Sequence, residues 1–303
     1  MQENKAHRPK TIFITGSEGF VGKELVKKCH SLGYKTVCVD LPKVQRSEYF
    51  SADINKPEIA ELIPDGADAI IHLAALSRDS DCKNKAYECF TINVMGTLNL
   101  MQAAEQRNVK QFIFASTEWV YDNFVEGEEK TEDSIINIAN HTSEYALSKL
   151  VSEGNLRQNS KHGFCPVAIL RFGIIYGSRK DNWSAVESLF NQVRTQDKIT
   201  VGSLRTGRCF INVSDIVEGI VKSIGLPGFN IINLEGNRLL RLGEVIETSK
   251  KILNKNPEIV ETTPNNISIR PVSNKKAKEL LHWGPKINLE QGLRDLNAFL
   301  GDQ

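Results

Sequence analysis

Short apolar runs alternate with amphipathic segments along the first part of this 303-residue chain. The runs are rich in β-branched and aromatic residues, and such runs separated by helical segments indicate βαβ units. Parallel strands joined by right-handed crossovers carry helices on both faces of their sheet. The sequence therefore predicts a Rossmann-type, doubly wound parallel α/β sheet. The predicted strands are 11–15, 34–39, 69–73, 111–115 and 167–171, and the predicted helices are 21–32, 87–107 and 143–160.

The pattern changes after Gly177. Helical and short strand signals follow one another less regularly, around a polar loop at 202–207. We interpret this part as a smaller C-terminal α/β lid over the carboxyl ends of the sheet. The predicted domains are residues 1–177, which bind a dinucleotide, and residues 178–303, which bind the substrate and return some elements to the main sheet. The expected helices are 184–194, 214–224, 242–253, 274–281 and 289–300, and the expected strands are 209–213 and 229–234.

The composition is that of a globular protein with a substantial core, with 40% hydrophobic and 25% charged residues. A formal net charge of +1 provides no field that would attract nucleic acid or an anionic membrane. The polar N-terminus has no signal-peptide pattern, and no run approaches the roughly 20 apolar residues of a membrane span. Six cysteines without close pairing indicate free thiols and no metal site. We expect a cytoplasmic protein.

Three glycines, Gly16, Gly19 and Gly22, stand between the first predicted strand and the first predicted helix. Glycines in this context allow a tight turn and a close approach of the backbone, so that a pyrophosphate can lie on the helix N-terminus. Glycine turns are common, but the position after a strand and before a helix favours a dinucleotide site.

Asp40 ends the second predicted strand. A carboxylate there accepts hydrogen bonds from ribose hydroxyls and repels a 2′-phosphate, which favours NAD over NADP. Arg46 is too far along the chain to act as a phosphate clamp. The alternative interpretation of Asp40 is a solvated residue at a strand end.

Tyr145 and Lys149 are four residues apart in a predicted helix, so they share one face. An ammonium beside a phenol favours the phenolate and lowers the pKa of the tyrosine toward the range of a general base. A YxxxK spacing also occurs by chance on exposed helices. Its position after a dinucleotide fingerprint favours a catalytic pair.

Together these motifs resemble the extended short-chain dehydrogenase/reductases, in the NAD-dependent epimerase/dehydratase group. The resemblance covers nearly the whole chain. The matching segments are TGSEGFVG, VDLP, HLAA at 72–75, NVMGT at 93–97, ASTEWVY at 115–121, YALSK, LRFGIIYG at 170–177, RCFINVSDI at 208–216 and the tail RPVSNKKAKELLHWGPK.

The resemblance implies roles for individual residues. Tyr145 is the acid/base, Lys149 binds the nicotinamide ribose and tunes Tyr145, and Thr117 orients the substrate. Asn93 matches an asparagine at the start of a helix-bounding turn near the cofactor. Asp53 and Ile54 match an acidic–aliphatic pair that contacts adenine, with a solvated loop as the alternative. The further cofactor-binding positions are Phe20, Val21, Leu73, Ala74 and Ala75.

Some positions depart from the patterns of the subgroups. In sugar 4,6-dehydratases the corresponding segment resembles TDEVYG, which contains two adjacent acids. Glu118 can serve as the first acid, but Trp119 occupies the position of the second. This difference argues against an elimination reaction and against the decarboxylases, which tend to have a glutamate at the second position. The segment also resembles TDYVFDG of 4-keto reductases, although these favour NADPH. Ile174 replaces the asparagine of RYFNVYG epimerases, which weakens the assignment of a standard UDP-sugar. Arg208 and Arg270 resemble diphosphate-binding arginines, or are solvated lid residues.

The leading hypothesis is an NAD-dependent nucleotide-sugar epimerase that works through a transient 4-keto intermediate. The alternatives are an NAD-dependent oxidoreductase (a 4-keto sugar reductase or a dehydrogenase), a dehydratase or decarboxylase of a sugar nucleotide, and a binding module without catalysis. The retained Thr117, Tyr145 and Lys149 argue against the last. The resemblance further implies a homodimer formed by the helices 87–107 and 143–160.

Overall fold

The computed structural model describes residues 9–41, 47–125 and 127–301. The N-terminal segment, Pro42 of the VDLP motif and Arg46 lie outside these ranges. The contacts divide the chain into two compact units that interleave along the sequence. Unit 1 comprises Met1–Ser116, His141–Leu170 and Ser223–Ile231, and unit 2 comprises Thr117–Asn140, Arg171–Lys222 and Ile232–Gln303. The ligand-binding domains 1–177 and 178–303 stay predictions, because they are defined by what they bind.

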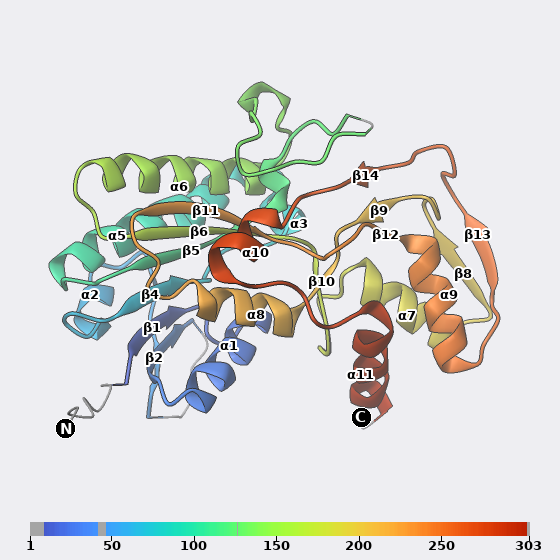
Figure 1. The fold of residues 1–303 in the computed structure, drawn as a ribbon, viewed down its shortest axis with the longest axis horizontal. Helices are drawn as coiled ribbons and strands as arrows, with labels where there is room; N and C mark the ends of the chain where they lie inside the picture. Colours follow the sequence, from blue (N-terminus) through green and yellow to red (C-terminus); the bar gives the residue numbers. More distant parts are fainter. Residues whose placement is uncertain (1–8, 42–46, 126, 302–303) are drawn as a thin grey trace. The chain divides into compact units, whose positions relative to one another are not determined.

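A seven-stranded sheet has the strand order β11-β6-β5-β4-β1-β2-β3 (Figure 1). The pairs β1–β2, β2–β3, β1–β4 and β4–β5 are all parallel. The order reverses at β1, as in a doubly wound Rossmann-type sheet, which confirms the predicted fold class. The strands are β1 (Thr11–Thr15), β2 (Lys35–Asp40), β3 (Tyr49–Ser51), β4 (Ala69–His72), β5 (Phe112–Thr117), β6 (Val167–Phe172) and β11 (Phe229–Leu234).

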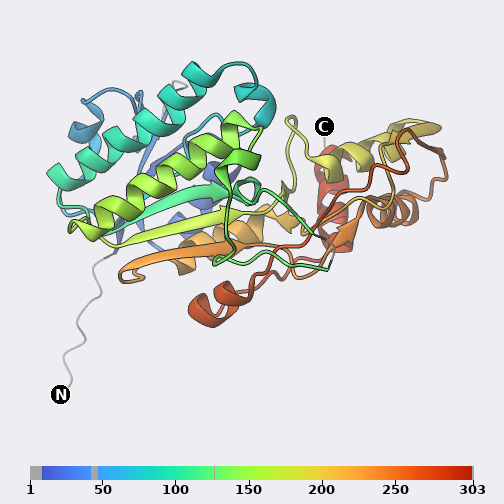
Figure 2. The same cartoon turned by 90° about the horizontal axis from the view of Figure 1, so that it is seen from above.

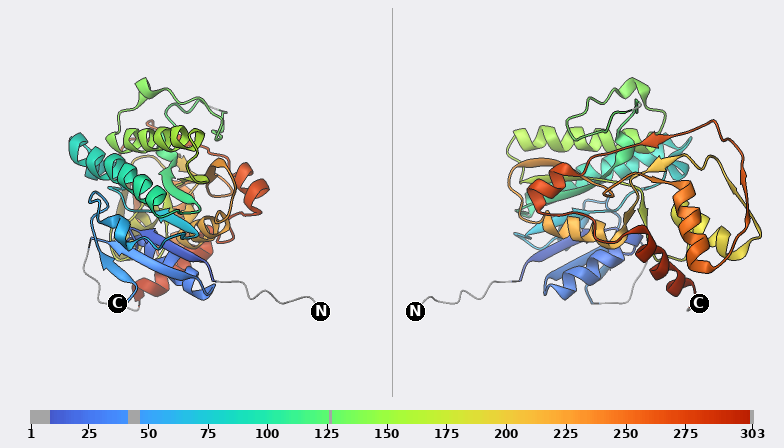
Figure 3. Two further views of the ribbon diagram at one scale, coloured as in Figure 1. Left: turned by 90° about the vertical axis from the view of Figure 1, so that its left-hand side faces the viewer. Right: turned by 45° about the vertical axis from the view of Figure 1, so that its right-hand side comes forward.

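Helices cover both faces of the sheet in unit 1. Helix α1 (Phe20–Ser31) lies on one face, and α5 (Gly96–Gln106) and α6 (Glu144–Lys161) lie on the other (Figure 3, left). Helices α5 and α6 run side by side (Figure 2). Shorter helices are α2 (Ile59–Leu62), α3 (Asp79–Cys82) and α4 (Ala86–Phe90). The hydroxyl of Ser143 caps α6 by accepting from the Ala146 amide at 3.1 Å.

The segment predicted as one helix over 87–107 contains a π-helical turn, Thr91–Met95, between α4 and α5. A π turn inserts one residue into the helical register and is frequent at functional sites. Apolar periodicity does not reveal such a turn, because the apolar face continues on both sides of it.

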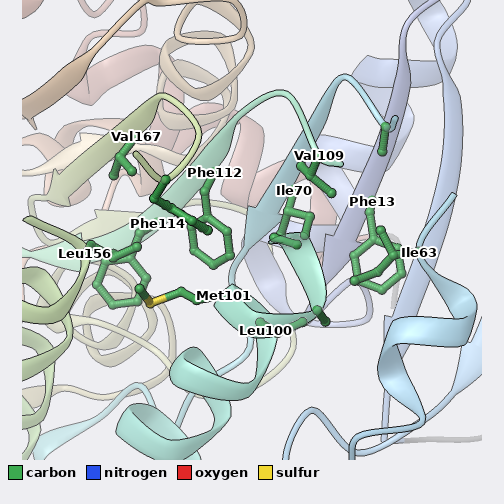
Figure 4. Close-up of a cluster of buried hydrophobic side chains, with 14 of the residues drawn as sticks. Phe13, Ile63, Ile70, Leu100, Met101, Val109, Phe112, Phe114, Leu156 and Val167 are labelled. Carbon is green, nitrogen blue, oxygen red and sulfur yellow. The ribbon is translucent and has the colours of Figure 1, made fainter. Parts of the chain in front are cut away.

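The core of unit 1 lies between the sheet and α5 and α6. Phe13, Ile70, Phe112 and Phe114 come from the three strands β1, β4 and β5, and the helices add Leu100, Met101 and Leu156 (Figure 4). The aromatic and β-branched residues that predicted the strands are therefore the residues that fill this core.

Unit 2 has its own apolar core, which includes Phe190, Ile199, Val245, Ile246 and Leu293. Helices α7 (Ala185–Thr195), α9 (Leu242–Leu253) and α11 (Leu289–Gly301) pack against one another, and α8 (Val213–Lys222) and α10 (Lys275–Leu281) complete the set. These helices begin and end within about two residues of their predicted bounds.

The strands of unit 2 differ from the prediction. The predicted strand 209–213 is reduced to β10 (Ile211–Asn212), which pairs with β7 (Ile175–Tyr176). Around it lie β9 (Gly207–Arg208), between β12 (Leu240–Arg241) and β14 (Ile269–Arg270), and β8 (Lys198–Val201), which pairs with β13 (Glu258–Glu261). Two-residue strands form through partners distant in sequence, so local periodicity does not predict them. The predicted strand 229–234 is β11, which returns to the main sheet.

Candidate functional site

The glycine-rich turn between β1 and α1 is too tight for side chains. Gly16 has a φ of +70°, and a Cβ on it would lie 2.7 Å from the Ala74 amide nitrogen. A Cβ on Gly22 would lie 2.1 Å from the Gly16 carbonyl oxygen. Gly19 is the N-cap of α1, so the amides of Phe20 and Val21 lie in the first turn, where helices leave N–H groups without intrahelical partners. The turn thus presents backbone donors suited to an anion.

Asp40 fixes this turn from the end of β2. Its Oδ2 accepts from the Glu18 amide at 2.8 Å, and its Oδ1 accepts from the Leu41 amide at 2.8 Å. The hydroxyl of Ser17 beside it is buried and has no hydrogen-bond partner among the described residues. A glycine cradle, a carboxylate and an unused buried hydroxyl fit the phosphates and ribose of a dinucleotide.

Asn93 connects three segments of unit 1 from within the π turn. Its Oδ1 accepts from the Leu76 amide at 2.8 Å, and its Nδ2 donates to the Leu76 carbonyl and to the Ser148 hydroxyl, both at 3.0 Å. Asn93 therefore fixes the loop after β4 to α6. That loop contains Leu73, Ala74 and Ala75, and the Ala74 amide donates to Thr15 Oγ1 at 3.3 Å. The expected helix-bounding turn is instead the π turn inside the long helix.

Asp53 and Ile54 lie in the loop after β3. The Asp53 carboxylate accepts from the Asn55 backbone amide at 2.9 Å. Ile54 is buried and packs against Gly96 at the start of α5, where a Cβ would come within 2.6 Å of its Cδ1. This loop is therefore held by its own contacts.

Lys149 and Tyr145 are both buried on α6. The Lys149 ammonium donates to the Ala115 carbonyl of β5 at 2.8 Å and lies 4.7 Å from the centre of the Phe114 ring. Burial lowers the pKa of Lys149 from 10.5 to about 8, although Cys89, Cys82 and Glu153 oppose the shift. Tyr145 packs with Cys82 and Cys89. The helix thus presents a fixed ammonium one turn from a phenol.

The other predicted catalytic and substrate residues, Thr117, Glu118, Arg208 and Arg270, belong to unit 2. Thr117 ends β5, and its hydroxyl accepts from the Trp119 amide at 3.2 Å, which starts a 3₁₀ turn over Glu118–Val120. Glu118 is 1% exposed, and neither carboxyl oxygen has a hydrogen-bond partner among the described residues. Burial raises the pKa of Glu118 to about 7, and the charges of Arg208 and Arg270 oppose the shift.

Arg208 and Arg270 are direct partners on the neighbouring parallel strands β9 and β14. The Arg208 guanidinium donates to the Ser268 carbonyl at 2.7 Å and to the Ser268 hydroxyl at 3.0 Å. The Arg270 guanidinium lies 5.4 Å from the centre of the Trp119 ring. Trp119, which stands where other sequences have a second acid, thus supports an arginine. The two cations lie side by side, an arrangement suited to a diphosphate.

Glu235, directly after β11, was not predicted as a site residue. It is fully buried, and neither carboxyl oxygen has a hydrogen-bond partner among the described residues. A Cβ on Gly173 would lie 2.1 Å from its Oε2, so Glu235 occupies the space that this glycine leaves free. Burial, together with the nearby Glu118, raises the pKa of Glu235 well above its ordinary value. A single acidic residue after a predicted strand is typical of a solvated turn, so the sequence does not indicate that Glu235 is a site residue.

Ile174 lies next to Gly173 and packs against the apolar core of unit 2. Within the described residues there is no cluster of three or more histidine, cysteine or acidic side chains that could hold a metal ion. No helix among them has both the length and the apolar character needed to cross a membrane. All six cysteines are free thiols.

The sequence model of the NAD dependent epimerase/dehydratase family matches residues 12–233, so the chain belongs to this family. It is an NAD-dependent enzyme, which confirms the predicted family, enzyme class and cofactor.

Individual relatives align over most of the chain. An "Uncharacterized UDP-glucose epimerase YtcB" from Bacillus subtilis (strain 168) is 29% identical over 95% of this chain and 97% of its own length. "UDP-glucuronic acid decarboxylase 1" from Arabidopsis thaliana is 30% identical over 93% of this chain and 68% of its own length. The solved structure "MoeE5 in complex with UDP-glucose and NAD" has a TM-score of 0.86 at 21% identity, and covers 96% of this chain and 99% of that one. This likeness shows the shared fold.

Proposed function

We propose that this chain is an NAD-dependent nucleotide-sugar epimerase that works through a transient 4-keto intermediate. The observation that carries the proposal is the buried Lys149, anchored on the Ala115 carbonyl one helical turn from Tyr145. The family membership and the UDP-glucose epimerase relative support it.

Residues 1–177 are proposed to bind NAD. The glycine turn receives the pyrophosphate on the N-terminus of α1, and Asp40 accepts hydrogen bonds from the ribose hydroxyls. Asp53 and Ile54 contact the adenine, and the loop that contains Leu73, Ala74 and Ala75, fixed by Asn93, adjoins the cofactor. When bound, NAD would supply reversible hydride transfer at the sugar carbon, which inverts this carbon if the hydride is returned to the opposite face.

Tyr145 is proposed to remove the proton of the sugar hydroxyl during oxidation and to return it during reduction. Lys149 binds the nicotinamide ribose and favours the phenolate through its positive charge. Its anchor on Ala115 lies two residues before Thr117, the residue proposed to orient the reacting hydroxyl. Glu118 is the further candidate acid/base, since its pKa of about 7 allows both protonation states at neutral pH.

Residues 178–303 are proposed to bind the substrate. Arg208 and Arg270, paired on β9 and β14, hold its diphosphate. Nucleotide sugars carry this group, and the named substrates of the relatives are UDP-sugars.

A second candidate is the decarboxylation of a sugar nucleotide, because relatives at 27–30% identity are named UDP-glucuronic acid decarboxylases. A screen of nucleotide sugars at saturating NAD, with chromatography of the sugar product and absorbance at the NADH band, separates the candidates. Epimerisation gives a stereoisomer without net NADH. Stoichiometric NADH indicates a net oxidoreductase, and release of carbon dioxide indicates a decarboxylase. Either result would contradict the proposed function.

We further propose a cytoplasmic homodimer formed through α4, α5 and α6. Tyr87 lies on α4 and Met95 ends the π turn between α4 and α5. They are 88% and 57% exposed, which is unusual for large apolar side chains. Light scattering should give twice the chain mass, and Tyr87→Glu together with Met95→Glu should reduce it to the monomer mass. A wild-type monomer at micromolar concentration would contradict this proposal.

A further inference from the structure

Two buried carboxyl groups of unit 2, Glu118 and Glu235, have no hydrogen-bond partner among the described residues. They are 1% and 0% exposed. Burial of a charged carboxyl group without a partner is strongly unfavourable, so folded proteins rarely retain one without a use. Two such groups in one unit indicate that their partners arrive with a ligand.

The two carboxyl groups have different surroundings. Arg208 and Arg270 act on Glu118 and lower its pKa, against the effect of burial. The groups that act on Glu235 are Glu118, the Cys209 thiol and Glu132, and none of these is basic. Two neighbouring buried carboxylates do not both ionise readily, so the pair retains a proton at neutral pH.

The backbone around the pair is closely packed. A Cβ on Gly173 would meet Glu235, and a Cβ on Gly236 would lie 2.3 Å from the Phe210 carbonyl oxygen. Glu118 directly follows Thr117, the residue proposed to orient the reacting hydroxyl. The pair is therefore fixed in position beside Thr117, which would place it at the sugar of the proposed substrate, next to the guanidinium groups that act on Glu118.

We propose that Glu118 and Glu235 form a specificity-determining pair that binds the hydroxyl groups of a neutral sugar and rejects a sugar that carries a carboxylate. The proposal rests on the proposed function, because it concerns the sugar of a nucleotide sugar. It assigns the enzyme to neutral hexoses and separates it from relatives named for UDP-glucuronic acid.

The chemistry of the pair explains this selectivity. A carboxyl pair that retains one proton can donate one hydrogen bond and accept several, which matches sugar hydroxyls, since these both donate and accept. A uronic acid brings a third carboxyl group, charged at neutral pH, beside a negatively charged pair. At a separation of about 8 Å and an effective dielectric constant of about 20, such repulsion weakens binding by roughly tenfold or more.

The test measures the binding of UDP, UDP-glucose and UDP-glucuronic acid by isothermal titration to the NAD-loaded protein. We expect UDP-glucose to bind at least about tenfold more tightly than UDP-glucuronic acid. In Glu235→Gln, which keeps the shape and the hydrogen-bonding groups, UDP-glucuronic acid should bind about tenfold more tightly than to wild type. UDP-glucose should change less than about threefold. Glu247→Gln, which removes an exposed acid of α9, should leave both affinities unchanged.

Wild-type protein provides a second measurement that does not depend on a variant. Between pH 6 and pH 8.5 Glu118, whose pKa is about 7, loses its proton, so the negative charge of the pair grows while the uronate stays charged. Discrimination against UDP-glucuronic acid should therefore increase with pH. Both ligands carry the same diphosphate, so its titration cancels in the ratio of the affinity for UDP-glucose to the affinity for UDP-glucuronic acid. The charged and titratable groups that act on the pair are Arg208, Arg270, Glu132 and Cys209, and the pKa of the Cys209 thiol, about 11, lies above this range.

The outcomes separate the two proposals. If none of the three ligands binds, the proposed function and this inference both fail. If UDP and both sugars bind, but the preference is absent, is unchanged in Glu235→Gln, or is constant with pH, the inference alone is overturned. A folded Glu235→Gln variant is established by its melting temperature, which we expect to equal or exceed that of wild type because an unpartnered buried acid is removed.

Discussion

Replacement of Lys149 by methionine should make the protein more stable and less active. Methionine keeps the length and the apolar stem of lysine but removes the ammonium from a site that is 3% exposed. The shift of the Lys149 pKa from 10.5 to about 8 means that the charged form is unfavourable in the folded protein by about 3 kcal/mol. Methionine also loses the contacts of the ammonium with the Ala115 carbonyl and the Phe114 ring, which reduces the gain in stability by about 1–2 kcal/mol. A net gain of about 1–2 kcal/mol at pH 7 remains.

The gain depends on pH in a defined direction. Below pH 8 the lysine is charged in both the folded and the unfolded chain, so the full penalty of burial acts on wild type. Between pH 8 and 10.5 the unfolded chain binds the proton that the folded protein has lost, so the stability of wild type rises with pH. The advantage of Lys149→Met should therefore shrink above pH 8 and approach zero or reverse near pH 10.

Urea unfolding of both proteins without ligand, at pH 7, 8, 9 and 10, measures this difference. Lys161→Met, at the exposed end of the same helix, is the matched control and should change stability by less than about 0.5 kcal/mol. Turnover of Lys149→Met should fall by about a hundredfold or more, since the phenolate loses its neighbouring charge. A variant that is less stable at pH 7, or an advantage that stays constant up to pH 10, would refute the reasoning.

Three further substitutions test the remaining assignments. Tyr145→Phe should lower turnover by about a hundredfold or more with the NAD affinity unchanged, and an unaltered turnover number would exclude Tyr145 as the acid/base. Asp40→Ala should weaken NAD binding about tenfold and narrow the preference over NADP, measured by titration of both cofactors; tighter NADP binding by wild type would contradict the role of Asp40. Arg208→Ala should raise KM for the best nucleotide sugar roughly ten- to hundredfold while the Kd for NAD stays constant, and an unchanged KM would show that the substrate is not held by its phosphates.

Local signals predicted the unit 1 framework closely. The strand 11–15 and the helices that contain Leu25, Leu100 and Leu156 lie where apolar periodicity indicates, because those apolar residues are the ones that fill the core. Local signals did not predict the strands β8, β12, β13 and β14. These strands are short, and their existence depends on partners about 30 to 60 residues away, such as Arg208 beside Arg270.

The parts of the candidate site that depend on the spacing of residues along the chain were predictable. Gly16 and Gly22 follow from the need for a tight turn, and Tyr145 and Lys149 share a face because they are four residues apart. The pKa values and hydrogen-bond partners of the site residues were not predictable. Lys149 was expected to tune Tyr145, but its own lowered pKa follows from burial under β5, and the role of Asn93 in fixing a loop follows from a π turn without a local signal.

The sequence by itself determined the main strands and helices of unit 1, the glycine cradle, the acid at the end of β2 and the pair on α6. All of these depend on residues within a few positions of one another. Only the tertiary structure decided that Arg208 and Arg270 are neighbours and that Glu118 and Glu235 are buried without partners. The physical reason is that cross-strand register and burial depend on segments far apart in sequence. The proton affinity of a carboxyl group then follows from this burial rather than from the residues next to it in the chain.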